Sequence, residues 1–533
     1  MSNNKNGQQR ADLHKTIWKM AEDCRGSVDG WDFKQYVLGM LFYRFISENL
    51  TKHLNDIERK SKDGDVNFDY SKISDKDAEL GRRETTEEKG FFILPSQLFC
   101  NVVKNASSNE DLNESLQKVF ASIESSAKGY DSEESIKGLF DDLDLSSKKL
   151  GSSVNKRNKL LAKLLTSIDN LDLEKDYNQN SIDAFGDAYE FLMNMYAANA
   201  GKSGGQYFTP QEVGELLAKL VSMHKTEINK VYDPCCGSGS LLLKFAKVLG
   251  KDHVNKYCGQ ESNITSYNLC RINMFLHDIN YNKFAIAHGD TLLDPKLSDQ
   301  EPFDAIVSNP PYSQQWDGDN NPILINDPRF APAGVLAPKS NSDFAFTMHM
   351  LSWLSPKGTA AIVEFPGVLY RSGAEQKIRK YLTENNYIDS VIKMPAGLFF
   401  GTGIETCIFV LKKNKKDNKV LFVDASEESI PNTNRGKNDK KIKMLSQDNI
   451  SNILEFVRLR QDKEHKTRLV DFEDIKAQGF NLSVSTYVAK KSTAEVVDIK
   501  VLNAEIKEIV KRQSVLRLSI DAIVADLEGG DNE

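Results

Sequence analysis

The tetrapeptide Asn309-Pro310-Pro311-Tyr312 combines residue types that could recognise an amino group on a planar ring. It follows the apolar, β-branched run Phe303–Ser308, which predicts a buried parallel strand that the two prolines must end, because they have no N–H to donate. The side-chain carbonyl of Asn309 and the backbone carbonyl of Pro310 could accept both N–H bonds of an exocyclic amine. Such acceptors would stabilise charge that develops on the nitrogen during methyl transfer. Tyr312 could stack on a flipped-out base. Taken alone, the tetrapeptide could equally be a rigid loop.

A second polar turn, Asp233 to Ser240, lies between a short apolar run and an apolar helical segment. A strand, a glycine turn and a helix in this order predict a nucleotide-binding βα unit. Gly237 and Gly239 are present, but Leu242 stands where a dinucleotide-binding loop has its third glycine, which disfavours NAD. With Asp233 ahead of the turn, the loop better suits a cofactor with a cationic methionine part and no phosphate.

Two acidic residues follow the next two predicted strands. Glu261 ends the segment Tyr257–Glu261, about 20 residues beyond the glycine turn, where a carboxylate would accept the two hydroxyls of a ribose. A lone glutamate at this place could also be a solvated helix start. Asp290 lies in the third predicted strand segment, Ala285–Leu292, and is a candidate partner for an adenine amino group.

The segment before the glycine turn holds a further candidate site. Gly201-Lys202-Ser203 resembles the end of a Walker A loop, but Tyr196 stands where the first glycine is required and a helical segment precedes it. We therefore reject an ATP-binding loop. Thr209 is the expected N-cap, and Pro210 the first residue, of a helix that runs to about Met223.

The composition of the 533 residues is that of a soluble globular protein of two or three domains. The polar start gives no sign of a signal peptide, and the seven scattered cysteines lack paired CxxC motifs. Both features predict reduced thiols, no structural zinc and a cytoplasmic location. The net charge of −7 is unlike that of a protein that holds nucleic acid unaided. If DNA is the substrate, we expect another chain to supply much of the hold.

Flanking the site, the sequence predicts mostly helices before it and alternating helices and strands after it. Residues 11–165 have helical apolar spacing, the charged stretch Lys60–Lys89 is predicted to be a mobile loop or irregular insertion, and a helix is expected over Ile182–Ala197. After the tetrapeptide, Asp317–Pro338 is predicted to be a long loop that acts as a lid or contacts DNA. The further expected elements are Leu160–Leu171, Asp343–Leu354, Ala360–Glu364, Ile388–Lys393 and Thr406–Leu411.

The C-terminal tail carries a narrow aliphatic stripe from Ile499 onward. The spacings of three and four residues continue over about four heptads. The stripe consists of Leu502, Ile506, Ile509, Gln513, Leu516, Ile520, Ile523 and Leu527. This pattern favours pairing with a helix of another chain, in which Gln513 would set the register, although a single helix packed on its own core would look much the same.

Four pieces of the chain resemble amino-group DNA methyltransferases that place the cofactor half before the catalytic motif: Gln206 to Pro210, Asp233 to Ser240, Glu261, and Asn309 to Tyr312. Together with the helical N-terminal region, two further segments resemble the modification subunits of type I restriction-modification systems: Phe185–Leu192 and Met394–Ile404. The resemblance implies S-adenosyl-L-methionine as methyl donor and the N6 of adenine in double-stranded DNA as acceptor. It also implies a DNA-specificity subunit and a restriction subunit as partners, with two copies of this chain per complex.

The candidate residues come from these turns and from the positions that match the family. Those for the cofactor are Gln206, Tyr207, Phe208, Thr209, Pro210, Gln211, Asp233, Gly237, Ser238, Gly239, Ser240, Glu261 and Asp290. The candidate catalytic residues are Asn309, Pro310, Pro311, Tyr312, Phe399 and Phe400, where one of the two phenylalanines matches the aromatic that sandwiches the flipped base.

The predicted architecture is an α-helical N-terminal domain over residues 1–170, a doubly wound Rossmann-like α/β methyltransferase core over 171–485, and a coiled-coil-like helix over 486–533. Methylation of cytosine N4 or of a protein glutamine stays an alternative, because the tetrapeptide serves any planar amine. A catalytically idle DNA-binding scaffold is a third possibility, which the presence of Asn309 and Glu261 disfavours. No cluster of carboxylates and lysine supports a nuclease.

Overall fold

The structure is a computed structural model that describes residues 15, 32–61, 64–171, 192, 209–318, 321–399, 405–432, 442–489 and 499–529. The chain divides into two compact units, Met1–Val488 and Ala489–Glu533. The helix predicted over Ile182–Ala197 lies outside the described residues apart from Leu192. The predicted domain boundary near residue 170 stays a prediction, because residues 172–191 are also outside them.

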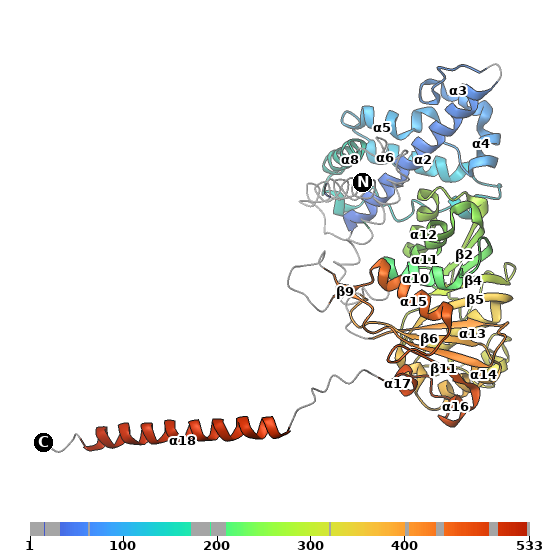
Figure 1. Ribbon diagram of the computed structural model, residues 1–533. Helices are drawn as coiled ribbons and strands as arrows, with labels where there is room; N and C mark the ends of the chain where they lie inside the picture. Colours follow the sequence, from blue (N-terminus) through green and yellow to red (C-terminus); the bar gives the residue numbers. More distant parts are fainter. Residues whose placement is uncertain are drawn as a thin grey trace. The chain divides into compact units, whose positions relative to one another are not determined.

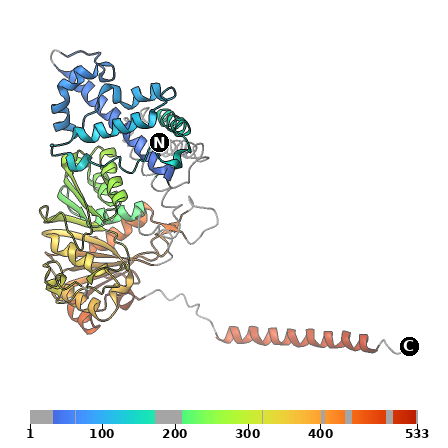
Figure 2. The ribbon, with the colours of Figure 1, turned by 180° about the vertical axis from the view of Figure 1, so that it is seen from behind.

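The first part of the larger unit is helical, as its apolar spacing predicts. The long helix α2 spans Asp32–Lys60 and packs against α5 (Phe99–Ala106) and α8 (Val154–Asp169). Helix α6 (Leu112–Ser126) lies beside α8. Helix α2 also contacts α12 (Ile264–Leu276), so the helical region lies along one end of the sheet in both views (Figures 1 and 2).

Residues 64–89 differ from the prediction of a loop, because they form short helical segments. Helix α4 spans Arg82–Lys89, preceded by α3 (Asp75–Ala78) and 3-10 turns. Local caps stabilise these segments: the Ser74 side chain accepts from Asp77 N, and Gly90 ends α4 with a φ of 89°. The stretch has too few apolar residues for a periodic signal, so only its caps could have revealed it.

A nine-stranded sheet organises the rest of this unit within the described residues (Figure 1). Its strand order is β11-β8-β6-β7-β5-β4-β1-β2-β3, in which β7 is antiparallel to both neighbours and β11 is antiparallel to β8. The strands are β1 (Ile228–Asp233), β2 (Val254–Glu261), β3 (Phe284–His288), β4 (Phe303–Ser308), β5 (Leu354–Glu364), β6 (Ile388–Lys393), β7 (Cys407–Lys412), β8 (Lys419–Asp424) and β11 (Thr467–Asp471).

Helices cover both faces of this sheet, which confirms the predicted doubly wound α/β fold. Alternate residues of β1 belong to two different cores: Val231 packs with one apolar cluster and Tyr232 with the other. The first face carries α10 (Gln211–Val221), α11 (Ser240–Leu249), α12 and α15 (Gln447–Leu459), and the second carries α13 (Asp343–Trp353) and α14 (Ala374–Glu384).

The strand order reverses at β1, which pairs in parallel with β2 on one side and with β4 on the other. Both strands end at the same edge of the sheet, β1 at Asp233 and β4 at Ser308. In open α/β sheets, a crevice forms beyond the strand ends at such a reversal, and ligands bind there. The glycine turn and the tetrapeptide follow these two strands directly.

The predicted start of α10 is wrong by one residue. Helix α10 begins at Gln211, with Pro210 at the N-cap position and no side-chain cap, and it ends at Val221 rather than Met223. The Thr209 hydroxyl instead accepts a hydrogen bond from the Asn309 side chain at 3.1 Å. Thr209 is a residue type that often caps helices, but in this fold its hydroxyl bonds to Asn309, which is far away in the sequence.

The predicted long loop after the tetrapeptide is confirmed. Among its described residues, regular structure between β4 and α13 is limited to short 3-10 turns, which include Leu324–Asn326 and Ala331–Ala333. The downstream strands also follow the prediction, although β5 begins at Leu354, six positions before the predicted Ala360.

The smaller unit contains helix α18, which spans Ile499–Gly529 and therefore begins with the predicted aliphatic stripe, later than the residue 486 predicted for the C-terminal segment. Its aliphatic stripe is exposed, with Ile509 at 65% and Leu516 at 62% of their full accessible area. Among the described residues, we find no helix with the length and apolar character needed to cross a membrane.

Candidate active site and cofactor pocket

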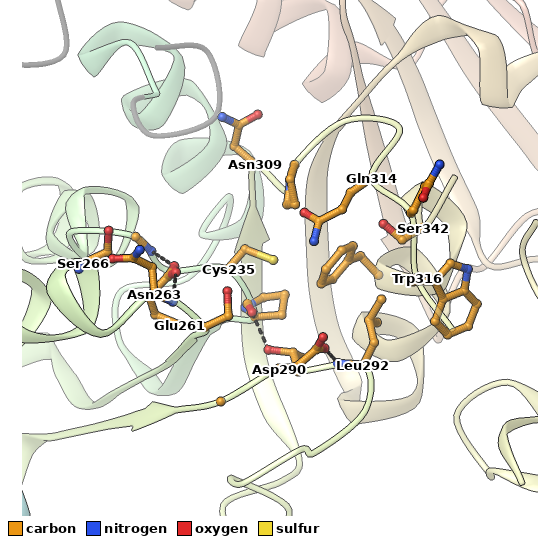
Figure 3. A pocket seen from close by; sticks show the side chains of 18 residues that line it. Cys235, Glu261, Asn263, Ser266, Asp290, Leu292, Asn309, Gln314, Trp316 and Ser342 are labelled. Carbon is orange, nitrogen blue, oxygen red and sulfur yellow. Dashed lines mark hydrogen bonds between the residues drawn. The ribbon is translucent and has the colours of Figure 1, made fainter. Parts of the chain in front are cut away.

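A pocket of about 160 Å³ lies at the carboxyl edge of β1 to β4, at the reversal of the strand order (Figure 3). Five of the predicted site residues line it together: Gly237, Glu261, Asp290, Asn309 and Pro311. The other lining residues come from the same turns, from the start of α12, from the loop after the tetrapeptide and, for Phe346, from α13: Pro234, Cys235, Ser262, Asn263, Ser266, Gly289, Thr291, Leu292, Gln314, Gln315, Trp316, Ser342 and Phe346.

The glycine turn has a backbone that only glycine adopts easily. Gly239 has a φ of 80°, and a Cβ built on it would lie 2.7 Å from the Cys270 sulfur of α12. The side-chain amide of Asn273, also on α12, donates to the Ser238 carbonyl at 2.9 Å. Helix α12 therefore fixes the turn from behind. Ser238, Gly239 and Ser240 belong to the turn but not to the pocket wall.

Glu261 joins the glycine turn to the start of α12. Its Oε2 accepts from the backbone N–H of Gly237 at 3.0 Å, and its Oε1 accepts from the N–H of Asn263 at 2.8 Å. Both carboxylate oxygens thus have fixed directions at the rim of the pocket. Asn263, which caps α12 through Ser266 N, lines the same wall. Sequence reasoning missed Asn263, although a capping residue two positions after Glu261 was a usable signal.

Asp233 lies beneath the turn rather than in the pocket wall, with 1% of its area exposed. Its Oδ1 accepts from Cys235 N at 2.9 Å and from the Ser308 hydroxyl at 3.0 Å. Burial raises the pKa of Asp233 to about 7, and the charge of nearby Glu261 acts in the same direction. Asp233 therefore ties the end of β1 to the end of β4, and its carboxyl group titrates near neutral pH.

Asp290 lies at the exposed end of the turn after β3. Its Oδ1 accepts from Leu292 N at 2.8 Å and from Leu293 N at 3.3 Å. The hydroxyl of Thr291 donates to the Pro234 carbonyl at 2.6 Å, which fastens this turn to the glycine turn. The Oδ2 of Asp290 has no hydrogen-bond partner within the described part of the chain, so it can accept from a ligand.

Asn309 is oriented by hydrogen bonds at both ends of its side-chain amide. Its Nδ2 donates to the Thr209 hydroxyl at 3.1 Å, and its Oδ1 accepts from the Tyr312 hydroxyl. The Tyr312 ring meets Phe399 edge to face, with ring centres 6.4 Å apart, and Phe399 is buried. Phe400 and the cofactor candidates Gln206, Tyr207 and Phe208 lie outside the described residues.

Two buried carboxyl groups lie near the loop of the tetrapeptide, and one of them, Asp343, accepts a hydrogen bond from it. Ser313 has a φ of 51°, and its N–H donates to the Asp343 Oδ1 at 3.1 Å. Glu364, at the end of β5, accepts a hydrogen bond from the Thr347 hydroxyl at 2.6 Å. Burial raises the pKa of Glu364 well above its ordinary value, and the charge of Asp343 adds to the effect. The sequence carried no signal for this pair, because the two residues meet only in the folded chain.

Comparison with known proteins identifies the family. The family model for N-6 DNA methylases matches residues 180–496, and the model for the HsdM N-terminal domain matches residues 13–168. The chain belongs to the N-6 DNA methylase family. The type I restriction enzyme MpnII methylase subunit of Mycoplasma pneumoniae is 46% identical over 98% of this chain and 98% of its own length. The predicted membership among type I modification subunits is thereby confirmed.

Solved structures of similar proteins agree with this membership. The methyltransferase subunit of a type I restriction-modification system from Streptococcus thermophilus has a TM-score of 0.79 and 33% identity, covering 90% of this chain and 99% of that chain. A structure from work on complex assembly and conformational transition of the type I system has a TM-score of 0.62 at 15% identity, covering 98% and 99% of the two chains, and shows a shared fold.

The pocket of this N-6 DNA methylase fits a nucleoside cofactor better than a metal ion. Among the described residues, histidine, cysteine, aspartate and glutamate nowhere form a group of three that could hold a metal. The glycine cradle, the two fixed oxygens of Glu261 and the open Oδ2 of Asp290 instead offer acceptors for hydroxyl and amino groups. A pocket wall lined with such hydrogen-bond acceptors suits the ribose hydroxyls and the adenine amino group of S-adenosyl-L-methionine.

Proposed function

We propose that this chain transfers a methyl group from S-adenosyl-L-methionine to the N6 amino group of adenine at specific DNA sites. It does so as the modification subunit of a type I restriction-modification complex. One observation carries the proposal: Asn309, at the end of β4, lines the same pocket as Glu261 and Asp290 (Figure 3). An acceptor for the target amine therefore lies beside acceptors suited to the methyl donor.

Each wall of the pocket would hold one part of the cofactor, which supplies a methyl group on a positively charged sulfur. Glu261 accepts hydrogen bonds from the ribose hydroxyls, and Asp290 accepts one from the adenine amino group. Because the glycine turn has no bulky side chains, the ligand can lie close to its backbone. Asp233 provides a carboxylate beneath the turn for the cationic methionine part. Thr209, Pro210 and Gln211 complete the site, together with Gln206, Tyr207 and Phe208, Ser238 and Ser240.

Asn309 and Pro310 would bind the target amine through their carbonyl oxygens. Two acceptors fixed in advance favour the pyramidal nitrogen and stabilise its developing positive charge. The Tyr312 hydroxyl donates to the Asn309 Oδ1 in this structure and leaves the second lone pair of that oxygen for the target amine. Tyr312 then stacks on the flipped base, and Phe399 or Phe400 encloses the other face.

The partners would be double-stranded DNA, a DNA-specificity subunit and a restriction subunit, with two copies of this chain in each cytoplasmic complex. The net charge of −7 makes tight DNA binding by this chain alone unfavourable, so the specificity subunit supplies much of the hold. The exposed aliphatic stripe of α18 pairs with a helix of that subunit. Residues 1–170, 171–485 and 486–533 then act as the helical domain, the catalytic core and the assembly helix.

Nucleoside mass spectrometry tests the reaction itself. The chain is coexpressed with its specificity subunit in a host that lacks other DNA methylases, and the genomic DNA is digested to nucleosides. N6-methyladenine should accumulate with the active chain and be strongly reduced with Asn309→Ala. Accumulation of N4-methylcytosine, or of neither base, would overturn the proposal.

A further inference from the structure

The loop after the tetrapeptide carries a buried arginine that reaches back to the cofactor pocket. Arg329 has 5% of its area exposed. Its Nη1 donates to the Thr291 carbonyl and its Nη2 to the Leu292 carbonyl, each at 2.7 Å. Both carbonyls belong to the turn after β3, and both residues line the pocket. One side chain therefore joins two segments that are far apart in the sequence.

Every N–H of the guanidinium group has an acceptor. Asp327 accepts from Nε and from Nη2, the latter at 2.7 Å, and pairs with the buried charge. The remaining N–H of Nη1 faces the His349 Nδ1 at 3.3 Å. Burial and the nearby Arg329 charge lower the pKa of His349 well below its ordinary value, so the neutral ring accepts there and its Nε2 meets the Tyr232 hydroxyl at 3.0 Å. A fully paired guanidinium has one geometry, which makes it a rigid anchor.

The anchored turn is the one that presents Asp290. The Oδ1 of Asp290 is held by two backbone N–H groups of this turn, those of Leu292 and Leu293. The direction of the open Oδ2 is thus set by the turn's backbone, and that backbone is held by Arg329 on one side and by the Thr291 hydroxyl on the other. Figure 3 shows Asp290 and Leu292 at the base of the pocket, with Gln314 and Trp316 of the Arg329 loop along one wall.

We propose that Arg329 is a positioning residue for recognition of the cofactor's adenine ring. It fixes the turn from Asp290 to Leu292 so that the Oδ2 of Asp290 points at the 6-amino group. The segment that carries Arg329 also lines the pocket through Gln314, Gln315, Trp316 and Ser342, so it contributes to the cofactor site both directly and through Arg329. This inference rests on the proposed role of Asp290 in binding that amino group.

The test compares two ligands that differ at the 6-position of the purine. S-adenosylhomocysteine carries the 6-amino donor, and S-inosylhomocysteine carries an oxygen in its place. Calorimetry on the full chain should give wild type a preference of about tenfold or more for the amino compound, the size of one hydrogen bond to a charged group. In Arg329→Met the preference should fall to about threefold or less, because the turn no longer aims Asp290.

Arg379→Met is the matched control. Arg379 is also a buried arginine that donates to two backbone carbonyls, those of Val368 and Phe480, but it lies away from the pocket. Its loss should lower stability as much as the loss of Arg329 and leave the ligand preference unchanged. In the assembled complex, Arg329→Met should raise the KM for S-adenosylmethionine while kcat at saturation stays within about twofold.

The outcomes separate the two claims. A wild-type preference near one would overturn the role of Asp290 and this inference with it. A strong wild-type preference that survives in Arg329→Met would overturn the inference and leave the proposed function standing. If Arg329→Met fails to fold, Arg329→Lys and Thr291→Val decide, since each removes part of the turn's support. If both variants keep the wild-type preference for S-adenosylhomocysteine, the proposed positioning role of Arg329 is refuted.

Discussion

Cofactor binding should release a proton near neutral pH, and Asp233 is the group that loses it. Burial raises the pKa of this carboxyl to about 7 in the free protein. A cationic methionine group placed above it favours the ionised form, so the bound state lowers that pKa. Affinity should then rise with pH up to about 7. If Asp233 is ionised at every pH in the complex, the dissociation constant exceeds its limiting value at high pH by about twofold at pH 7 and about elevenfold at pH 6.

Calorimetry between pH 5.5 and 7 measures this dependence, and the range stays below the ordinary pKa of the cofactor's own α-amino group. Two buffers with different ionisation enthalpies report the released proton directly. Asp233→Asn keeps an acceptor for Cys235 N and the Ser308 hydroxyl, so it should fold, bind independently of pH and release no proton. A flat curve for the wild type, or the same slope in Asp233→Asn, would refute the reasoning.

Three further changes probe other parts of the molecule. Glu261→Gln keeps an acceptor for only one of the backbone N–H groups of Gly237 and Asn263 and loses the charge, so calorimetry should show about ten- to a hundredfold weaker cofactor binding; unchanged affinity would contradict the ribose role. The raised pKa of Glu364 means that the wild type loses stability as pH rises above the unfolded value near 4.5. Urea unfolding of Glu364→Gln should lack that loss, and parallel pH profiles would argue against it. Ile509→Asp combined with Leu516→Asp in α18 should abolish copurification with the specificity subunit and leave cofactor affinity unchanged, whereas Lys511→Ala should assemble normally.

The strands that carry the site were predictable because each leaves a strong local signal. The apolar run Phe303–Ser308 stops at two prolines, and β1 stops at a glycine turn, so both strand ends could be located. The doubly wound order followed from the alternation of strands and helices. The capped segments around α4 carried no apolar period, which is why residues 64–89 were predicted to be a loop.

The supporting residues of the site were not predictable, because their partners are distant in the sequence. Thr209 was assigned to a helix cap from its type, whereas the fold gives its hydroxyl to Asn309. Arg329 lies in a segment without periodicity, and its carbonyl partners at Thr291 and Leu292 become its neighbours only in the folded chain. The residues that would contact ligands can be located from local sequence patterns. The residues that orient them cannot, because their contacts form only through tertiary packing.

The catalytic role of Asn309 is the central claim, and single-turnover methyl transfer in the assembled complex tests it most directly. Asn309→Ala should bind S-adenosylmethionine and DNA with affinities within about twofold of wild type. Its rate of methyl transfer should fall by about 10²- to 10³-fold or more, the effect of removing one preorganised acceptor from a transition state. A wild-type rate in Asn309→Ala, with both ligands bound, would contradict the account.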